Sequence, residues 1–146
     1  MFDGSVIPWC NEFRYLGVHV QASTKFKCSM HYTKRNFCRA ANAVLGKLSI
    51  CANEDIILYL IRTKCLPLLL YGTESICLSK AEISSLDFTV MRFLMKIFKS
   101  SDRALILECM EYFGLSLPSV LISYRTRKFM SKLSVHDTAI FNLYKM

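Results

Sequence analysis

The stretch Ser79–Ile97, with the sequence SKAEISSLDFTVMRFLMKI, decides the fold class of this chain. Its first residues place Ser79 and Glu82 at the spacing of a capping box, in which the two residues satisfy each other's backbone N–H groups at the start of a helix. Apolar residues then recur at helical spacing, at Ile83, Leu86, Val90, Leu94 and Ile97. The stretch therefore predicts a helix with one buried face.

Helix signals continue on the C-terminal side of this stretch. Asp102 has the short acceptor side chain that favours an N-cap, and Gly114 suits the end of the helix that follows. Pro118 fits the first turn of a further helix, which the apolar pattern extends to about Leu133. Two more helices are therefore expected.

Two helices are also expected on the N-terminal side. Thr24–Leu48 reads as one long amphipathic helix with basic residues on much of its circumference. Asn53 is a plausible N-cap for a second helix, which Pro67 ends nearby. The almost wholly apolar stretch Leu66–Tyr71 fits either a turn of helix or a short extended piece.

The first twenty residues read as a short β-hairpin. Ser5–Pro8 is followed by alternation through Phe13, Tyr15 and Val18-His19-Val20, with Gly4 and Asn11-Glu12 available for turns. Two strands alone are marginal in water, so the hairpin is expected to need a neighbouring sheet. The predicted fold class is mainly α, with a short N-terminal β-hairpin followed by a bundle of about five helices.

The positive charge of the chain is unevenly distributed. Nineteen Lys and Arg against eleven Asp and Glu give a formal net charge of +8, and no acidic residue lies between Glu12 and Glu54. This segment is a candidate for binding a polyanion. On the expected first helix, the side chains that can reach phosphates are Lys27, Lys34, Arg35 and Arg39. The alternative is a solvated basic face. Secondary phosphate contacts and solubility explain the later basic residues equally well; these are Arg92, Lys96, Lys99, Arg125, Arg127, Lys128 and Lys132.

Cysteine spacing gives no sign of a disulfide scaffold or a zinc site. The chain has seven cysteines and no C-x-x-C pair, and its three histidines do not supply the missing partners. Reduced cysteines in an intracellular protein, nuclear or cytoplasmic, are the expectation. No uncharged run reaches the roughly 20 residues that a bilayer requires, so no membrane contact is predicted.

Three stretches together resemble the C-terminal part of a reverse transcriptase from a non-LTR (LINE-type) retrotransposon. They are FRYLGVHV at residues 13–20, LPLLLYGTE at residues 66–74 and LDFTVMRFLMKIFK at residues 86–99. In that family a primer-grip hairpin closes the palm and a helical thumb follows. The resemblance implies a primer-grip-like β-hairpin, the end of the palm, over residues 1–22. It implies a helical thumb-like domain with a C-terminal extension over residues 23–146.

The resemblance also implies a function. Tyr15, Leu16 and Gly17 would hold the primer strand, and the basic first helix would clamp an RNA/DNA hybrid or duplex through phosphates without reading sequence. Reverse transcription needs Mg ions held by paired palm carboxylates. No two of the aspartates here are adjacent, at Asp3, Asp55, Asp87, Asp102 and Asp137. The chain is therefore expected to have no catalytic, metal or cofactor site and to depend on the palm and fingers of a parent polymerase.

Other interpretations stay open at this point. Taken without the family, Gly17 fits a strand bulge beside a Tyr15 packed in the core. A non-enzymatic helical domain that binds a protein, or a non-functional relic of a mobile element, is the alternative function, because exposed apolar surface on the hairpin would seek partners. Glu108 and Glu111 read as a surface pair on a helix. Cys28 and His31 lack an orienting acid, so neither pair indicates a small enzyme.

Overall fold

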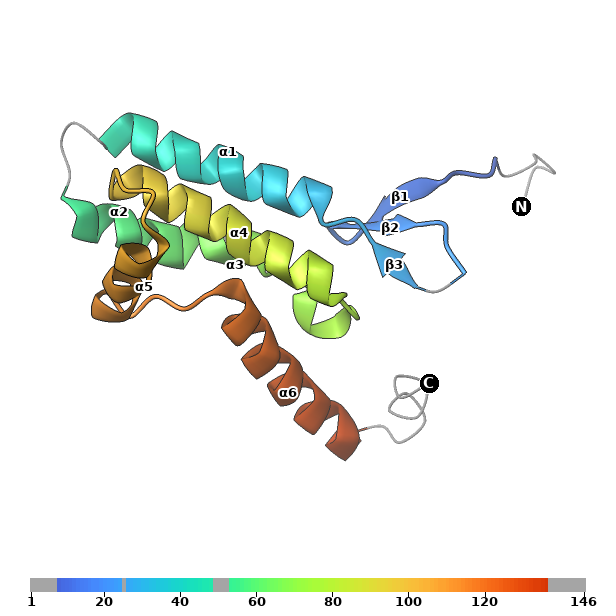
Figure 1. Ribbon diagram of the computed structural model, residues 1–146. Coiled ribbons are helices and arrows are strands. Elements are labelled where there is room, and N and C mark those ends of the chain that lie inside the picture. Colours follow the sequence, from blue (N-terminus) through green and yellow to red (C-terminus); the bar gives the residue numbers. More distant parts are fainter. Residues whose placement is uncertain (1–7, 25, 49–52, 137–146) are drawn as a thin grey trace.

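The computed structural model describes residues 8–24, 26–48 and 53–136. Figure 1 shows three strands followed by helices: β1 (Glu12–Tyr15), β2 (Val18–Gln21), β3 (Lys27–Cys28), α1 (His31–Leu48), α2 (Glu54–Leu60), α3 (Leu66–Leu69), α4 (Lys80–Ile97), α5 (Arg103–Tyr112) and α6 (Pro118–His136). A π-helical turn, Ile61–Cys65, joins α2 and α3 into one continuous helix. The prediction of a mainly α fold, with N-terminal β structure and about five helices, is confirmed.

The predicted hairpin is present, but its turn lies elsewhere. β1 and β2 pair antiparallel with Tyr15 opposite Val18, and Leu16 and Gly17 form the turn with φ of 46° and 86°. Two positive φ values are typical of the tight hairpin turns whose twist matches that of the strands. The expectations of a turn at Asn11-Glu12 and of a bulge at Gly17 are therefore wrong. The predicted Ser5–Ile7 strand and the Gly4 turn lie outside the described residues.

The expected helix over Thr24–Leu48 is wrong in its first part, because α1 begins only at His31. Lys27 and Cys28 instead pair with β2 as a third antiparallel strand. The pairing satisfies backbone groups that a helix would otherwise satisfy. It also buries Cys28 and, just beyond the strand, Met30 against Ile76 in a small apolar cluster. The sheet thus extends past the expected boundary at residue 22.

The helix that was expected to end near Pro67 continues two residues past it, to Leu69. Proline lacks an N–H donor, and its ring crowds the carbonyl four residues earlier. The π-helical turn directly before Pro67 has a wider hydrogen-bonding pattern that accommodates this loss. The open question at Leu66–Tyr71 is therefore answered in favour of helix for its first four residues.

The three C-terminal helices begin where the sequence predicts. The Ser79 hydroxyl accepts from the Glu82 backbone N–H at 3.2 Å, and the Glu82 carboxylate accepts from the Ser79 N–H at 2.8 Å, which completes the capping box of α4. Asp102 caps α5 by accepting from the Ala104 N–H at 2.9 Å. Pro118 opens α6, which runs slightly past the predicted end.

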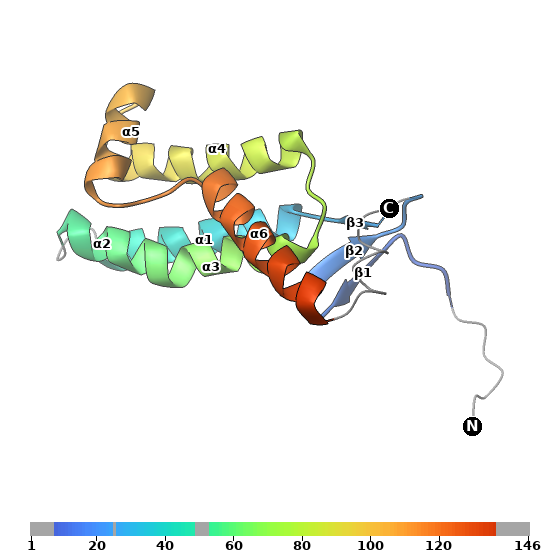
Figure 2. The ribbon, with the colours of Figure 1, turned by 90° about the horizontal axis from the view of Figure 1, so that it is seen from below.

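α1 and α4 form the centre of the bundle. Both ribbon views show them side by side and running in the same direction, away from the sheet (Figure 1, Figure 2). Phe37 of α1 is fully buried and meets Phe93 of α4 edge to face, with ring centroids 5.9 Å apart. The main core continues through further buried residues of α4 and of the other helical segments, including Ile61, Leu69, Leu86, Leu94, Ile106 and Ile122. This packing fixes which sides of α1 and α4 remain exposed.

Candidate nucleic-acid interface

The exposed side of α1 carries two arginines one helical turn apart. Arg35 and Arg39 are both exposed, while Phe37 and Ala41 anchor the opposite side of the helix in the core. No acidic residue lies anywhere in α1. Guanidinium groups present several N–H donors in a plane that matches phosphate oxygens, so this pair is suited to phosphate contact.

The two candidate lysines lie in a different electrostatic setting. The Lys34 ammonium donates to the Ser85 hydroxyl of α4 at 3.0 Å. Burial alone would raise the pKa of Glu82, but hydrogen bonds from Ser79 and the positive charges of Lys27 and Lys34 bring it below its ordinary value. An acid distant in the sequence therefore offsets both lysines, and Lys27 lies on β3 rather than on the helix.

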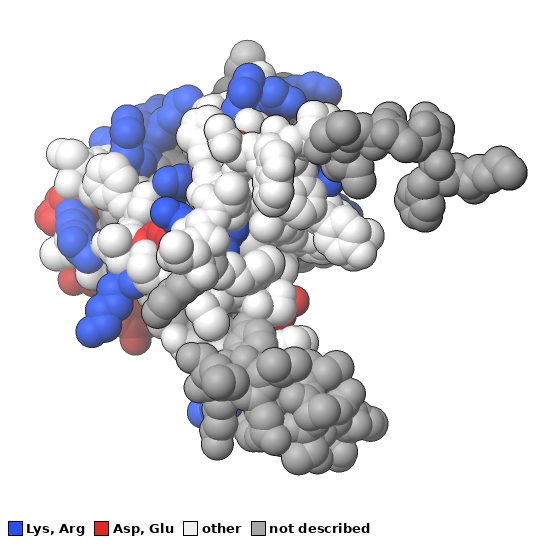
Figure 3. Space-filling model, turned by 90° about the vertical axis from the view of Figure 1, so that its right-hand side faces the viewer, with Lys and Arg blue, Asp and Glu red and all other residues white. Residues whose placement is uncertain are grey.

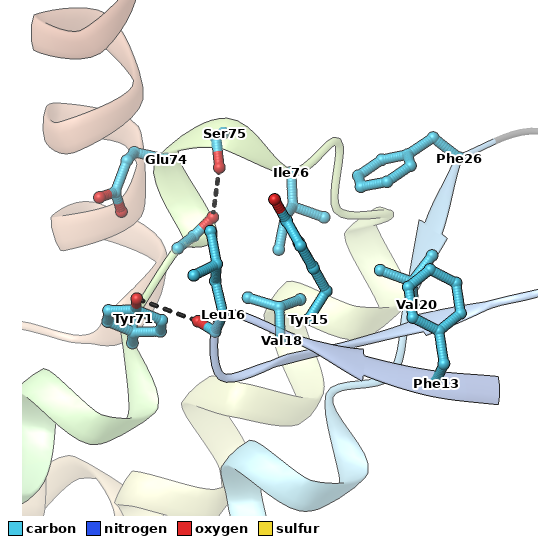
Figure 4. A pocket seen from close by; sticks show the side chains of 11 residues that line it. Phe13, Tyr15, Leu16, Val18, Val20, Phe26, Tyr71, Glu74, Ser75 and Ile76 are labelled. Carbon is cyan, nitrogen blue, oxygen red and sulfur yellow. Dashed lines mark hydrogen bonds between the residues drawn. The ribbon is translucent and has the colours of Figure 1, made fainter. Parts of the chain in front are cut away.

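The tip of the hairpin contacts Tyr71, which belongs to the second of the three resembling stretches, residues 66–74. The Tyr71 hydroxyl donates to the Leu16 carbonyl at 3.1 Å, as Figure 4 shows. A Cβ added to Gly17 would lie 3.3 Å from Cε1 of the Tyr71 ring. The group that lies close to Gly17 is therefore the Tyr71 side chain. The contact of Tyr71 with the hairpin was not predicted, because in the sequence Tyr71 stands out only as a member of the stretch at residues 66–74.

An apolar groove opens beside the tip. Phe13 and Tyr15 of β1 and Val18 and Val20 of β2 share one face of the sheet, in register. They line a groove of about 640 Å³ together with Phe26, Leu16, Tyr71 and Ile76. Figure 4 shows these side chains around the space, whereas the Glu74 carboxylate points away from it. Tyr15 is 64% exposed, so the alternative that packs it in the core is wrong.

Gly17 and Lys34, two of the candidate residues, lie on opposite flanks of α1. Thr33 and Asn36 line a cleft with Arg14 and Gly17, on the flank of α1 that faces α3 and the hairpin. Lys34 lies on the opposite flank, against α4. His19 of β2 stacks on Tyr32 at 3.8 Å between ring centroids, which fixes the sheet against the start of α1.

The exposed pair lies between the two flanks. Arg35 and Arg39 therefore belong to neither the hairpin cleft nor the contact with α4. Figure 3, a view from the strand end, shows Lys and Arg mainly along the upper and left-hand margins and mainly uncharged side chains across the middle.

The described residues give no support for chemistry at this surface. Among them, no group of three or more His, Cys, Asp or Glu lies close enough together to hold a metal ion. Cys28 lies on a strand, and burial first, then the charge of Glu82, raise the pKa of its thiol. A protonated thiol is a poor nucleophile. None of the helices that the structure describes is long and apolar enough to cross a membrane.

Comparisons with protein-family models, with curated proteins and with solved structures found no match to this chain. The functional assignment therefore rests on the residues and their geometry. Those residues are the exposed arginine pair, the hairpin tip held by Tyr71 and the groove beside it.

Proposed function

We propose that this chain clamps a template and primer, as an RNA/DNA hybrid or duplex, in the manner of the primer-grip hairpin and thumb of a non-LTR retrotransposon RNA-directed DNA polymerase. The observation that carries the proposal is the pair Arg35 and Arg39, exposed one turn apart on a helix without acidic residues. Contacts to phosphates hold a duplex in place without reading its sequence, which suits a polymerase that must copy any template.

The hairpin supports the same function. Tyr15 and Leu16 are exposed at the tip, and Tyr71 of the second motif holds that tip through a hydrogen bond. Two of the three stretches on which the resemblance rests thus touch each other. In the proposal, polymerisation depends on palm and fingers that supply the Mg-binding carboxylates, and the chain alone is not an enzyme. Its place of action is the nucleus or cytoplasm, where such a template is found.

Charge reversal at the arginine pair tests the proposal. Each charge-assisted hydrogen bond contributes about 1.5–3 kcal/mol, so the loss of two in Arg35→Glu with Arg39→Glu is expected to cost about 3–6 kcal/mol and to weaken binding by at least about 100-fold. The measurement is fluorescence anisotropy with a short labelled RNA/DNA hybrid. The matched control is Arg62→Glu with Lys64→Glu, two exposed residues of the π-helical turn with the same change in charge. Equal affinity of the two double variants would remove the phosphate-clamp assignment.

A second candidate, a non-enzymatic protein-interaction domain or relic, is favoured by one observation. Phe13, Leu16 and Phe26 are between 51% and 74% exposed around the apolar groove. Large exposed apolar side chains gathered in one place favour association with other proteins. If this candidate is correct, the purified chain self-associates and shows no affinity for nucleic acid at moderate salt. Phe13→Ser with Phe26→Ser would then restore the monomer.

A further inference from the structure

A polar seam runs along the outer edge of the contact between α1 and α4. At one end, the Lys34 ammonium donates to the Ser85 hydroxyl at 3.0 Å. Further along both helices, the Lys96 ammonium donates to the Asn42 side-chain oxygen at 3.1 Å. Ser85 and Lys96 lie three turns apart on one stripe of α4, so the two bonds mark the same edge of the interface. The seam joins the exposed side of α1 to that of α4.

Asn42 connects Lys96 to the arginine pair. It is exposed on α1 two turns after Arg35, and residues at this spacing lie on the same side of a helix. The hydrogen bond therefore places the Lys96 ammonium beside the row that Arg35 and Arg39 begin. The two lysines at the seam thus differ, because the negative charge of Glu82 acts on Lys34, whereas Lys96 donates to a neutral amide.

Lys96 keeps the capacity for another partner. An ammonium has three N–H donors, and the bond to Asn42 uses one of them. The side chain is exposed, so a phosphate oxygen can approach the remaining donors. Arg92, one turn earlier, is also exposed, but its guanidinium lies over the Phe88 ring, 5.8 Å from the centroid. Of the α4 basic residues that the structure describes, Lys96 is therefore the one with a demonstrated link to the α1 row.

We propose that Lys96 is a phosphate-binding residue of the nucleic-acid surface, which then spans α1 and α4 rather than α1 alone. This inference rests on the proposed function. Asn42 holds the ammonium in line with Arg35 and Arg39, so the surface offers a row of three cations from two helices. Such a row follows a phosphate backbone and reads no bases.

The test compares the salt dependence of binding for three variants and for Arg35→Gln, which removes one charge of the arginine pair. Lys96→Gln removes the charge, Lys96→Arg keeps it, and Lys64→Gln removes a charge from an exposed position on the π-helical turn. Affinity for a short RNA/DNA hybrid is measured by anisotropy between about 50 and 200 mM salt. Lys96→Gln is expected to make the slope of log affinity against log salt shallower by about 0.7–0.9, the value for one lost phosphate contact. Lys96→Arg and Lys64→Gln are expected to keep the wild-type slope.

The possible outcomes separate the two proposals. If Lys96→Gln behaves like Lys64→Gln while Arg35→Gln makes the slope shallower, the role of Lys96 is refuted and the proposed function stands. If the wild-type chain shows no salt-dependent binding, both are refuted. Thermal melts by circular dichroism check that each variant keeps its fold, which is expected because all three side chains are exposed.

Discussion

The same substitution is expected to have opposite effects at two glycines of this chain. Gly17 lies in the hairpin turn with φ of +86°, and an added Cβ would lie 3.3 Å from the Tyr71 ring. Gly46 lies in α1, and an added Cβ there would meet nothing within 4 Å. Gly17→Ala should therefore destabilise the hairpin, whereas Gly46→Ala should stabilise the helix.

The magnitudes follow from the two backbone conformations. An alanine forced into the left-handed region costs about 1–2 kcal/mol, and the tight contact with Tyr71 adds to this because the ring must shift by a few tenths of an ångström. That shift also strains the hydrogen bond from Tyr71 to Leu16. Replacing a helical glycine by alanine contributes about 0.5–1 kcal/mol of stability. The two variants should thus differ by about 2 kcal/mol or more.

Urea unfolding followed by circular dichroism gives the global free energy, and amide hydrogen exchange at Val18 and Val20 gives the local stability of the hairpin. Because the sheet is joined to the bundle by a small cluster around Ile76, the Gly17→Ala effect should be larger in the exchange of β2 than in global unfolding. Gly17→Ala with unchanged exchange, or Gly46→Ala with a lower unfolding midpoint, would refute this account of the turn and the helix.

Three further predictions concern the helices. Ser79→Ala removes the capping box of α4 and should lower the free energy of unfolding by about 1 kcal/mol in a urea titration at neutral pH. The pKa of Glu82 is lowered in the folded state, so the ionised Glu82 contributes its full stabilisation above the ordinary pKa of 4.5 and loses it as the pH falls through the lowered pKa. Glu82→Gln should remove this part of the pH dependence of the unfolding free energy. An unchanged dependence of stability on acid pH in that variant would contradict the prediction. Phe37→Ala, at a fully buried position against Phe93, should lower the free energy of unfolding by about 3–5 kcal/mol; a loss below 1 kcal/mol would contradict the packing of α1 on α4.

The helices most visible in the sequence were those with explicit start signals. Ser79 with Glu82 predicted the capping box, and Asp102 predicted the N-cap of α5, because both are local interactions between residues close in the chain. The start of α1 was misplaced because helical spacing continues back to Phe26. Pairing of Lys27 and Cys28 with β2 is a tertiary contact, which helical periodicity does not report.

The hairpin turn and the helical backbone after Pro67 were not predicted, for similar physical reasons. Leu16 adopts a positive φ that non-glycine residues rarely adopt, so Leu16-Gly17 was not predicted as the turn. The only sequence signal was Gly17 between two alternating stretches. The π-helical turn before Pro67 allows the helix to continue past the proline. Apolar periodicity and capping residues do not predict a π-helical turn.

The candidate site was predicted in part. Arg35 and Arg39 are exposed together, as their spacing indicated. The absence of acidic residues from this segment did not predict the electrostatic surroundings of Lys27 and Lys34, because Glu82 of α4 acts on both lysines. The link from Lys96 to Asn42 likewise depends on α1 and α4 lying side by side. Electrostatic neighbours distant in the chain become visible only in the fold.

The salt dependence of binding to an RNA/DNA hybrid tests the central claim most directly. If Arg35 and Arg39 each contact a phosphate, the slope of log affinity against log salt should be negative. It should become shallower by about 1.4–1.8 in the variant with Arg35→Glu and Arg39→Glu, which corresponds to two lost contacts. A flat slope for the wild-type chain, or the same slope for both proteins, would contradict the claim that this surface of α1 binds nucleic acid.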